Sequence, residues 1–197
     1  MVFTNGEHKD GEPDVAIFSN GDILVTYRRE VGSSLTQEIY RKYNRDGTPK
    51  SEEVIFAQEI APRLTAGCAT FGDDTFVVVS SEYFSSKDFY FYNSRDELFR
   101  IIEMDKYSAV PTFATSPNGK VLIHVDSEMI YLFDSNGDLI GYLDDYTEDE
   151  VGRAAAQDVV FLDDETLYIS WDLERFDPEN SNARDIFGRF IKLSQIN

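Results

Sequence analysis

The chain has 197 residues, of which 42% are hydrophobic and 14% aromatic, with 37 acidic against 18 basic side chains. A chain of this size buries roughly 70% of the surface that it exposes when unfolded, which suffices for a core without disulfides or metal. The formal net charge of −19 argues against nucleic acid and against anionic membranes as partners.

A repeat of about 48 residues organises the chain. Pro13, Pro62 and Pro111 are each 49 residues apart, and a stretch of small and apolar residues follows each of them. The fourth copy lacks the proline and starts near Ala155. A period in the forties is typical of repeat folds, so equivalent positions of the copies are expected to form equivalent elements.

Each copy opens with a predicted β-hairpin. Two short hydrophobic segments flank a turn built from Asn-Gly or from an acidic pair, residues that accept the positive φ of a hairpin turn. The segments are rich in β-branched and aromatic residues, which favour strands. The predicted strand pairs are residues 14–18 with 23–27, 68–71 with 76–80, 113–116 with 121–125, and 158–161 with 167–171.

A third strand with an apolar–aromatic pair follows each hairpin, and three copies continue into a fourth strand. The pairs are Ile39-Tyr40, Phe89-Tyr90, Ile130-Tyr131 and Ile186-Phe187, and the fourth strands cover residues 54–56, 98–102 and 139–143. The last copy ends after its third strand. We therefore predict that Val2-Phe3-Thr4 supplies its fourth strand and closes a ring, which removes two open sheet edges.

The predicted fold is an all-β, four-bladed β-propeller with four antiparallel strands in each blade. The chain forms one domain, with blades at about 12–60, 61–108, 109–152 and 153–197 together with 1–6. The repeats resemble propeller blades in general, and their number and length are similar to those of the hemopexin-like propellers. That resemblance implies a narrow axial channel, in some members with an ion on backbone carbonyls.

The longest connection between a second and a third strand, at 172–185, marks one candidate binding site. Unequal loops on a regular frame are where binding specificity usually lies. The candidate ligand-binding residues are Glu174, Arg175, Phe176 and Asp177 in this loop, with Tyr83 and Phe84 in the corresponding loop of the second copy. A solvated acidic loop is the alternative reading of 172–185.

The starts of the first strands give a second candidate site. Asp14, Arg63, Thr112 and Asp158 are predicted to surround one mouth of the axial channel. Arg63 among carboxylates is equally explained by an ion pair that joins two blades.

Few other residues carry specific chemistry. His124, aligned with Thr26, Val79 and Ser170, is predicted to be a hydrogen-bonded structural histidine, and the single Cys68 an inert buried thiol. Residues 134–138 alternate oxygen ligands as a calcium loop does, but a hairpin turn explains them equally and the EF-hand glycine and glutamate are missing. No cofactor is predicted apart from an ion on the axis or calcium in this loop.

The sequence contains no nucleophile or phosphate-binding motif, so a recognition module that binds a protein or a glycan is the leading functional hypothesis. The alternatives are a carboxylate-based hydrolase with an axial site, either a glycosidase or a metal-assisted enzyme, and a structural repeat of a larger surface protein. We expect a soluble protein, because no signal peptide and no apolar run of membrane-spanning length is found. We also expect a monomer or a homodimer.

Overall fold

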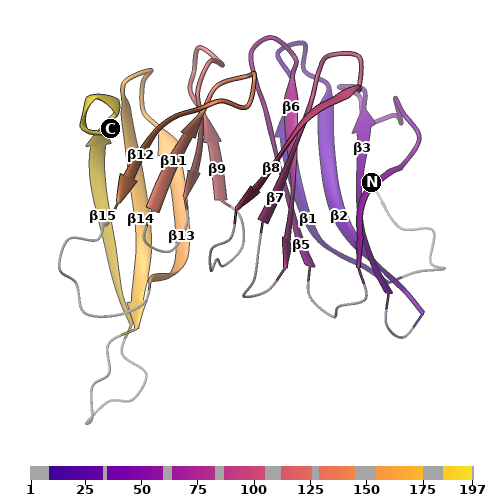
Figure 1. The fold of residues 1–197 in the computed structure, drawn as a ribbon, viewed down its shortest axis with the longest axis horizontal. Coiled ribbons are helices and arrows are strands. Elements are labelled where there is room, and N and C mark those ends of the chain that lie inside the picture. Colours follow the sequence, from indigo (N-terminus) through magenta and orange to yellow (C-terminus); the bar gives the residue numbers. More distant parts are fainter. Residues whose placement is uncertain are drawn as a thin grey trace.

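The computed structural model describes residues 9–32, 35–59, 64–82, 87–104, 112–125, 129–144, 154–174 and 184–196. These residues form strands and one short 3₁₀ helix, η1 (Leu193–Gln195) (Figure 1). The strands are β1 (Lys9–Ile17), β2 (Ile23–Val31), β3 (Leu35–Tyr43), β4 (Val54–Glu59), β5 (Leu64–Thr70), β6 (Phe76–Glu82), β7 (Lys87–Tyr92), β8 (Leu98–Met104), β9 (Thr112–Thr115), β10 (Leu122–Val125), β11 (Met129–Phe133), β12 (Leu139–Asp144), β13 (Ala154–Phe161), β14 (Thr166–Glu174) and β15 (Arg184–Lys192).

The strands form four antiparallel sheets, and within each sheet neighbours in the chain are neighbours in space. The first sheet is β1–β4, the second β5–β8, the third β9–β12 and the fourth β13–β15. The predicted all-β class and the four hairpins are confirmed, as are the third strands and the three fourth strands. In the described part of the chain no helix is long and apolar enough to cross a membrane.

The first turn of each sheet sets the register of the repeat. The amide of Phe18 donates to the carbonyl of Asp22, and the amide of Phe71 donates to that of Thr75, each four residues ahead. In the third sheet the amide of Ser116 donates to Val121, five residues ahead. The third turn is therefore one residue longer than the sequence alignment assumed.

The longer turn corrects the predicted alignment of His124. In the β1–β2, β5–β6, β9–β10 and β13–β14 pairings, the structural equivalents of His124 are Val25, Val78 and Ile169, one residue before those predicted. A shift of one residue moves a side chain to the other face of its sheet. His124 thus faces the second sheet, where its ring lies against Phe89.

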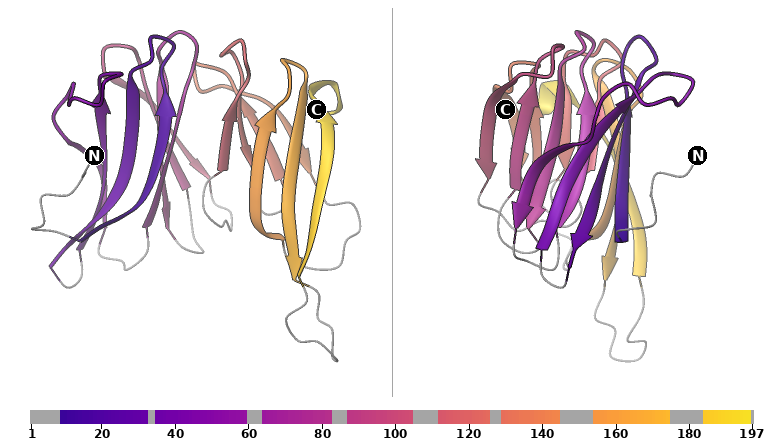
Figure 2. Two further views of the ribbon diagram at one scale, coloured as in Figure 1. Left: turned by 180° about the vertical axis from the view of Figure 1, so that it is seen from behind. Right: turned by 90° about the vertical axis from the view of Figure 1, so that its right-hand side faces the viewer.

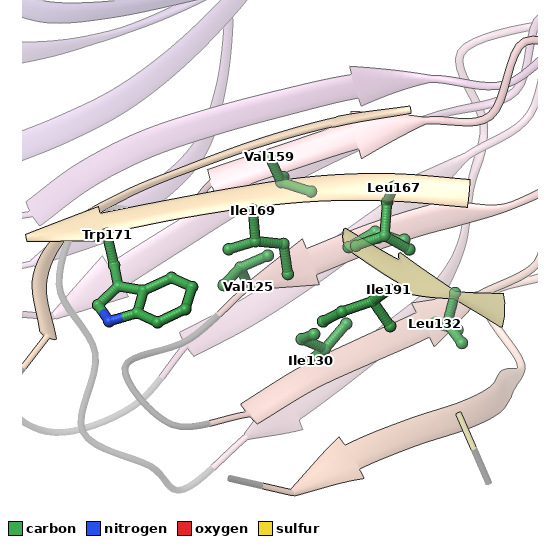
Figure 3. Close-up of a cluster of buried hydrophobic side chains, with 9 residues drawn as sticks. Val125, Ile130, Leu132, Val159, Leu167, Ile169, Trp171 and Ile191 are labelled. Atoms are coloured by element: carbon green, nitrogen blue, oxygen red, sulfur yellow. The ribbon is translucent and has the colours of Figure 1, made fainter. Parts of the chain in front are cut away.

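The sheets pack face to face, and a hydrophobic cluster fills each of the three junctions. Phe76 and Tyr92 lie in the first junction, Phe89 and Phe133 in the second, and Trp171 and Ile191 in the third (Figure 3). The innermost strands contact one another in the order β1, β5, β9 and β13. The small residues of the first strands, such as Ala69 and Ala114, allow this close approach.

Hydrogen bonds also tie together the turns of successive sheets. The hydroxyl of Ser19 donates to Asp74 over 2.8 Å, the amide of Gly72 donates to the carbonyl of Gly119 over 2.9 Å, and the amide of Asn118 donates to Asp164 over 2.8 Å. At the second turns, Lys42 pairs with Asp96 and Arg100 pairs with Asp138. Every sheet is thus joined to the next at the end of the molecule that carries the tight turns.

The four sheets follow a curve. The first and fourth sheets lie at opposite ends of the longest axis, with the other two between them (Figure 1). Seen from behind, the two end sheets lie nearer the viewer than the middle ones (Figure 2). The segment Val2-Phe3-Thr4, predicted to close the ring, lies outside the described residues; within them, β15 is hydrogen-bonded to β14 alone.

Candidate functional site

The two ends of the sheets differ in their connections. At one end, which we call the turn end, tight turns join the first strand of a sheet to the second and the third to the fourth. At the opposite end, the loop end, β2, β6, β10 and β14 stop and the third strands begin. Among the loop-end connections, residues 126–128 separate β10 from β11, whereas residues 175–183 separate β14 from β15. The unequal loop lengths predicted from the sequence therefore fall at one end of the molecule.

The predicted ligand-binding loops are mostly outside the described residues. Tyr83, Phe84, Arg175, Phe176 and Asp177 lie in undescribed segments, and only the backbone of Glu174 is placed, as the last residue of β14. β6 and β14 occupy equivalent places in their sheets and both end at the loop end. The strands on either side of both predicted loops therefore end at the loop end.

Three of the four predicted channel-mouth residues occupy one level of the innermost strands. Asp14 pairs with Thr26, Thr112 with Val125 and Asp158 with Ser170, which are equivalent positions. The second-sheet residue at this level is Gly67, which pairs with Val79. Arg63 lies outside the described residues, so the predicted residues that the structure describes lie at this level in the first, third and fourth sheets.

Asp14 joins two of the innermost strands. One carboxylate oxygen accepts a hydrogen bond of 2.8 Å from the amide of Val15, and the other accepts one of 2.8 Å from the amide of Cys68 in β5. Burial raises the pKa of Asp14 above its usual value, although both hydrogen bonds act in the opposite direction. Asp158 repeats the local contact through a 2.9 Å bond from the amide of Val159.

A buried lysine–histidine pair lies between the second and third sheets. Nζ of Lys87 is 3.1 Å from Nε2 of His124, and both side chains are buried. Nδ1 of His124 lies 3.3 Å from the carbonyl oxygen of Thr112. Because the Lys87 ammonium can only donate, Nε2 accepts and Nδ1 carries the proton. The predicted hydrogen bonding of His124 is confirmed.

Lys87 was not singled out from the sequence, although a signal was present. The side chains of a strand alternate between its faces, so Lys87 lies on the same face as Phe89 and Phe91. Both phenylalanines are fully buried. A lysine on the same face of a strand as two core phenylalanines predicts a buried ammonium group that has a partner.

We predict a pH-dependent stability that depends on His124. Burial, followed by the charge of Lys87, lowers its pKa well below the ordinary value of 6.5. Between the lowered pKa of the folded protein and the ordinary pKa of the unfolded chain, the unfolded chain binds a proton that the folded protein does not. The contribution of the neutral ring to stability is therefore fully present above about pH 6.5 and decreases as the pH falls. The slope reaches about 1.4 kcal/mol per pH unit.

Urea unfolding of the wild type and of His124→Gln from about pH 7 to pH 5 measures this dependence. The free energy of unfolding of the wild type should fall more steeply with decreasing pH than that of the variant, which lacks the titrating ring. His8 is present in both proteins and cancels in the comparison. Equal slopes would show that His124 is not buried in its neutral form.

Polar side chains are concentrated toward the loop end of the interior. Glu38 is fully buried on the face of β3 toward the second sheet. Burial, together with the charges of Asp88 and Glu38, raises the pKa of Tyr90 to about 12. The buried polar side chains in the loop-end parts of the strands are Thr26, Thr36, Glu38, Ser80, Ser81, Lys87 and His124, whereas Lys42, Thr70 and Ser116 lie toward the turn end.

Two further predictions concern cysteine and calcium. Cys68 is buried, and burial raises the pKa of its thiol, which keeps it protonated as predicted for an inert residue. At the candidate calcium loop, Oδ1 of Asp134 accepts hydrogen bonds from the amides of Asn136 and Asp138, which is a hairpin turn. Among the described residues no group of three or more potential ligands is placed to hold a metal ion.

Comparison with known proteins relates the chain to others through its fold. No protein-family profile and no curated protein matches it. The structure is similar to a protein of unknown function from Bacteroides caccae, with 13% sequence identity and a TM-score of 0.47, over 96% of this chain and 62% of that one. It is also similar to a putative exo-beta-1,3-galactanase from Bifidobacterium bifidum s17, with 14% identity and a TM-score of 0.48, over 95% of this chain and 69% of that one.

These likenesses, at such low identity, concern the fold alone. This chain spans less than two thirds of the Bacteroides caccae protein. The class defined by the described residues is an all-β protein of four antiparallel sheets with propeller-like packing.

Proposed function

We propose that this chain is a non-enzymatic binding module, built as a propeller, that engages a protein or a glycan through the loop end of its sheets. The observation that carries the proposal is the contrast between the two ends. The turn end is closed by short turns that bond to one another, whereas the loop end joins connections of unequal length over an interior rich in polar side chains. Such a division between scaffold and variable loops is typical of recognition folds.

The net charge of the chain narrows the ligand class. At −19, the chain repels sulfated, phosphorylated and other polyanionic ligands at physiological ionic strength. Neutral oligosaccharides and basic proteins are the ligands compatible with this negative charge. The aromatic side chains of Tyr83, Phe84 and Phe176 would supply stacking surfaces for a sugar or an arginine.

A binding experiment tests the proposal. The full chain is screened against an array of neutral and anionic oligosaccharides and against a set of basic and acidic proteins, and hits are titrated by calorimetry. Combined alanine substitution of Tyr83 and Phe84, or of Phe176 alone, should weaken binding about tenfold, equivalent to about 1.4 kcal/mol. Arg95→Ala, on the exposed second turn of the second sheet, is the matched control and should leave the Kd within about twofold.

A second candidate function is a carboxylate-based hydrolase with its site at the innermost strands. The observation in its favour is Asp14, whose pKa is raised by burial as a general acid requires, with Asp158 at the equivalent level of the fourth sheet. Against it, Asp14 uses both carboxylate oxygens to accept backbone hydrogen bonds. Turnover of an oligosaccharide that is abolished by Asp14→Asn or Asp158→Asn would favour this candidate over the binding module.

A further inference from the structure

A buried contact between two basic side chains joins the second and third sheets toward the loop end. Nζ of Lys87 lies 3.1 Å from Nε2 of His124, and the two residues are 2% and 0% exposed. Nδ1 donates to the carbonyl oxygen of Thr112, so both ring nitrogens are engaged while the ring is neutral. The rings of Phe89 and Phe113 lie against the imidazole, with centroids 5.2 and 5.0 Å from its own.

This contact cannot survive protonation of His124. A proton on Nε2 replaces the acceptor of the Lys87 hydrogen bond with a second donor, and it places two positive charges side by side. Repulsion between like charges is strong where water is excluded. One of the two side chains must therefore leave the contact when the ring is charged.

The other charged groups of this junction are few among the described strands. Arg100 pairs with Asp138 at the turn end, and Asp144 is the last residue of β12, where it pairs with Met129. Only histidine among these residue types ordinarily ionises between about pH 5 and pH 8. The charged or titratable residues at positions of β5 to β12 that face this junction are Lys87, Arg100, His124, Tyr131, Tyr142 and Asp144.

The turn end of the same junction is held by contacts that do not involve His124. The amide of Gly72 donates to the carbonyl of Gly119, and the hydroxyl of Thr115 donates to the carbonyl of Thr70, each over 2.9 Å. Apolar side chains pack between these bonds and the loop end. Loss of the Lys87 contact should therefore separate the two sheets at the loop end, with the turn end as the hinge.

We propose that Lys87 and His124 form an acid-sensitive latch, which opens the loop end between the second and third sheets when His124 is protonated and so weakens ligand binding. The proposal rests on the binding function proposed above and assigns its regulation. Lys87 directly follows residues 83–86, the connection that carries Tyr83 and Phe84. Because this connection belongs to the second sheet, separation of the sheets changes its spacing from the loop-end connections of the third and fourth.

Thiol labelling of Ser81→Cys measures the opening without any ligand. Ser81 is 3% exposed, pairs with Lys87 and lies on the face of β6 toward the third sheet. Its labelling rate, divided by that of a free cysteine peptide at the same pH, gives the fraction of open protein. We expect this ratio to rise about tenfold for each pH unit below about pH 6.5, because opening binds one proton. With His124→Gln added, the ratio should stay constant within about twofold.

Cys68 is the internal control in the same molecule. It is 4% exposed and lies in the junction between the first and second sheets, so its labelling should not follow the protonation of His124. Equal increases at Cys68 and at position 81 would indicate global unfolding and would overturn the latch. A position 81 that is still mostly protected at about pH 4.5 would also overturn it.

Nitrogen NMR of the wild type keeps the test independent of both substitutions. The chain has two histidines, and the ring of His124 should be neutral and protonated on Nδ1 at about pH 7. A charged ring, or a proton on Nε2, at this pH would contradict the latch.

Binding at two pH values separates failure of the latch from failure of the binding function. The array of neutral oligosaccharides and the set of basic proteins are screened at about pH 7 and at the pH where labelling shows about nine-tenths of the protein open. The Kd of each hit should then be about tenfold higher for the wild type and within about twofold for His124→Gln. Unchanged affinity of the open wild type would overturn the regulation. The absence of any hit at pH 7 would contradict the binding function, whereas labelling decides on the latch by itself.

Discussion

Gly119→Ala should lower the free energy of unfolding by about 3 kcal/mol, one of the two largest effects that we expect from a single substitution in this chain. Gly119 has a φ of +70°, which costs an L-residue about 1 kcal/mol or more. A Cβ at this position would also lie 2.4 Å from both Cα and N of Gly72, which are backbone atoms of the neighbouring sheet. Relief of this clash requires the second and third sheets to move apart, and overpacking of this kind costs roughly 1–3 kcal/mol.

Gly32→Ala is the matched control for this substitution. Gly32 has nearly the same φ, +69°, but no heavy atom of the described residues lies within 4 Å of its ideal Cβ. Its replacement should therefore cost only the conformational term of about 1 kcal/mol. Urea unfolding of the three proteins gives both differences. If the two variants lost equal stability, the close contact between the turns of the second and third sheets would be contradicted.

Phe76→Ala should destabilise the protein by about 3–5 kcal/mol, the usual cost of removing a fully buried phenylalanine. The ring of Phe76 is stacked on Tyr92, with centroids 5.0 Å apart and an interplanar angle of 8°. It also meets the ring of Tyr40 edge-on at 5.5 Å, and Nζ of Lys42 lies 4.2 Å from its centroid. The side chain therefore joins the first and second sheets, and its loss leaves a cavity between them.

Phe99→Ala is the comparison for Phe76→Ala. Phe99 lies in β8 and is 45% exposed, so its truncation should cost less than about 1 kcal/mol. Chemical denaturation followed by tyrosine fluorescence and by circular dichroism measures both variants. A loss below about 1 kcal/mol for Phe76→Ala would mean that the first and second sheets do not pack as described.

The strands were predictable from the sequence because hairpin turns have strong local signals. Asn20-Gly21 and Asn118-Gly119 require positive φ, and the structure places Gly21 and Gly119 at +86° and +70°. The register of the third hairpin was less predictable. Its turn contains one extra residue, and the residue types around the turn give no sign of this. This extra residue explains why the sequence aligns His124 with Thr26, Val79 and Ser170, one residue beyond its structural equivalents.

The buried polar residues were harder to predict. Glu38 and Lys87 are residue types that usually lie on the exposed face of a strand. Burial of a charged group depends on partners that are distant in sequence, so it was not predicted for either residue. The channel-mouth residues were predicted from the starts of the first strands, and the second-sheet residue at that level is Gly67. The start of a strand does not fix which of its residues reaches a given level, because the described first strands differ in length.

The stacking of similar sheets affects how such a protein can change over evolutionary time. Because each described sheet packs on its neighbours in the series, the core is built from short-range interfaces that repeat. Duplication or deletion of one unit of the gene would add or remove a layer without redesign of the remainder. Lineages that share this architecture can therefore differ in size by whole layers while they retain the same packing chemistry.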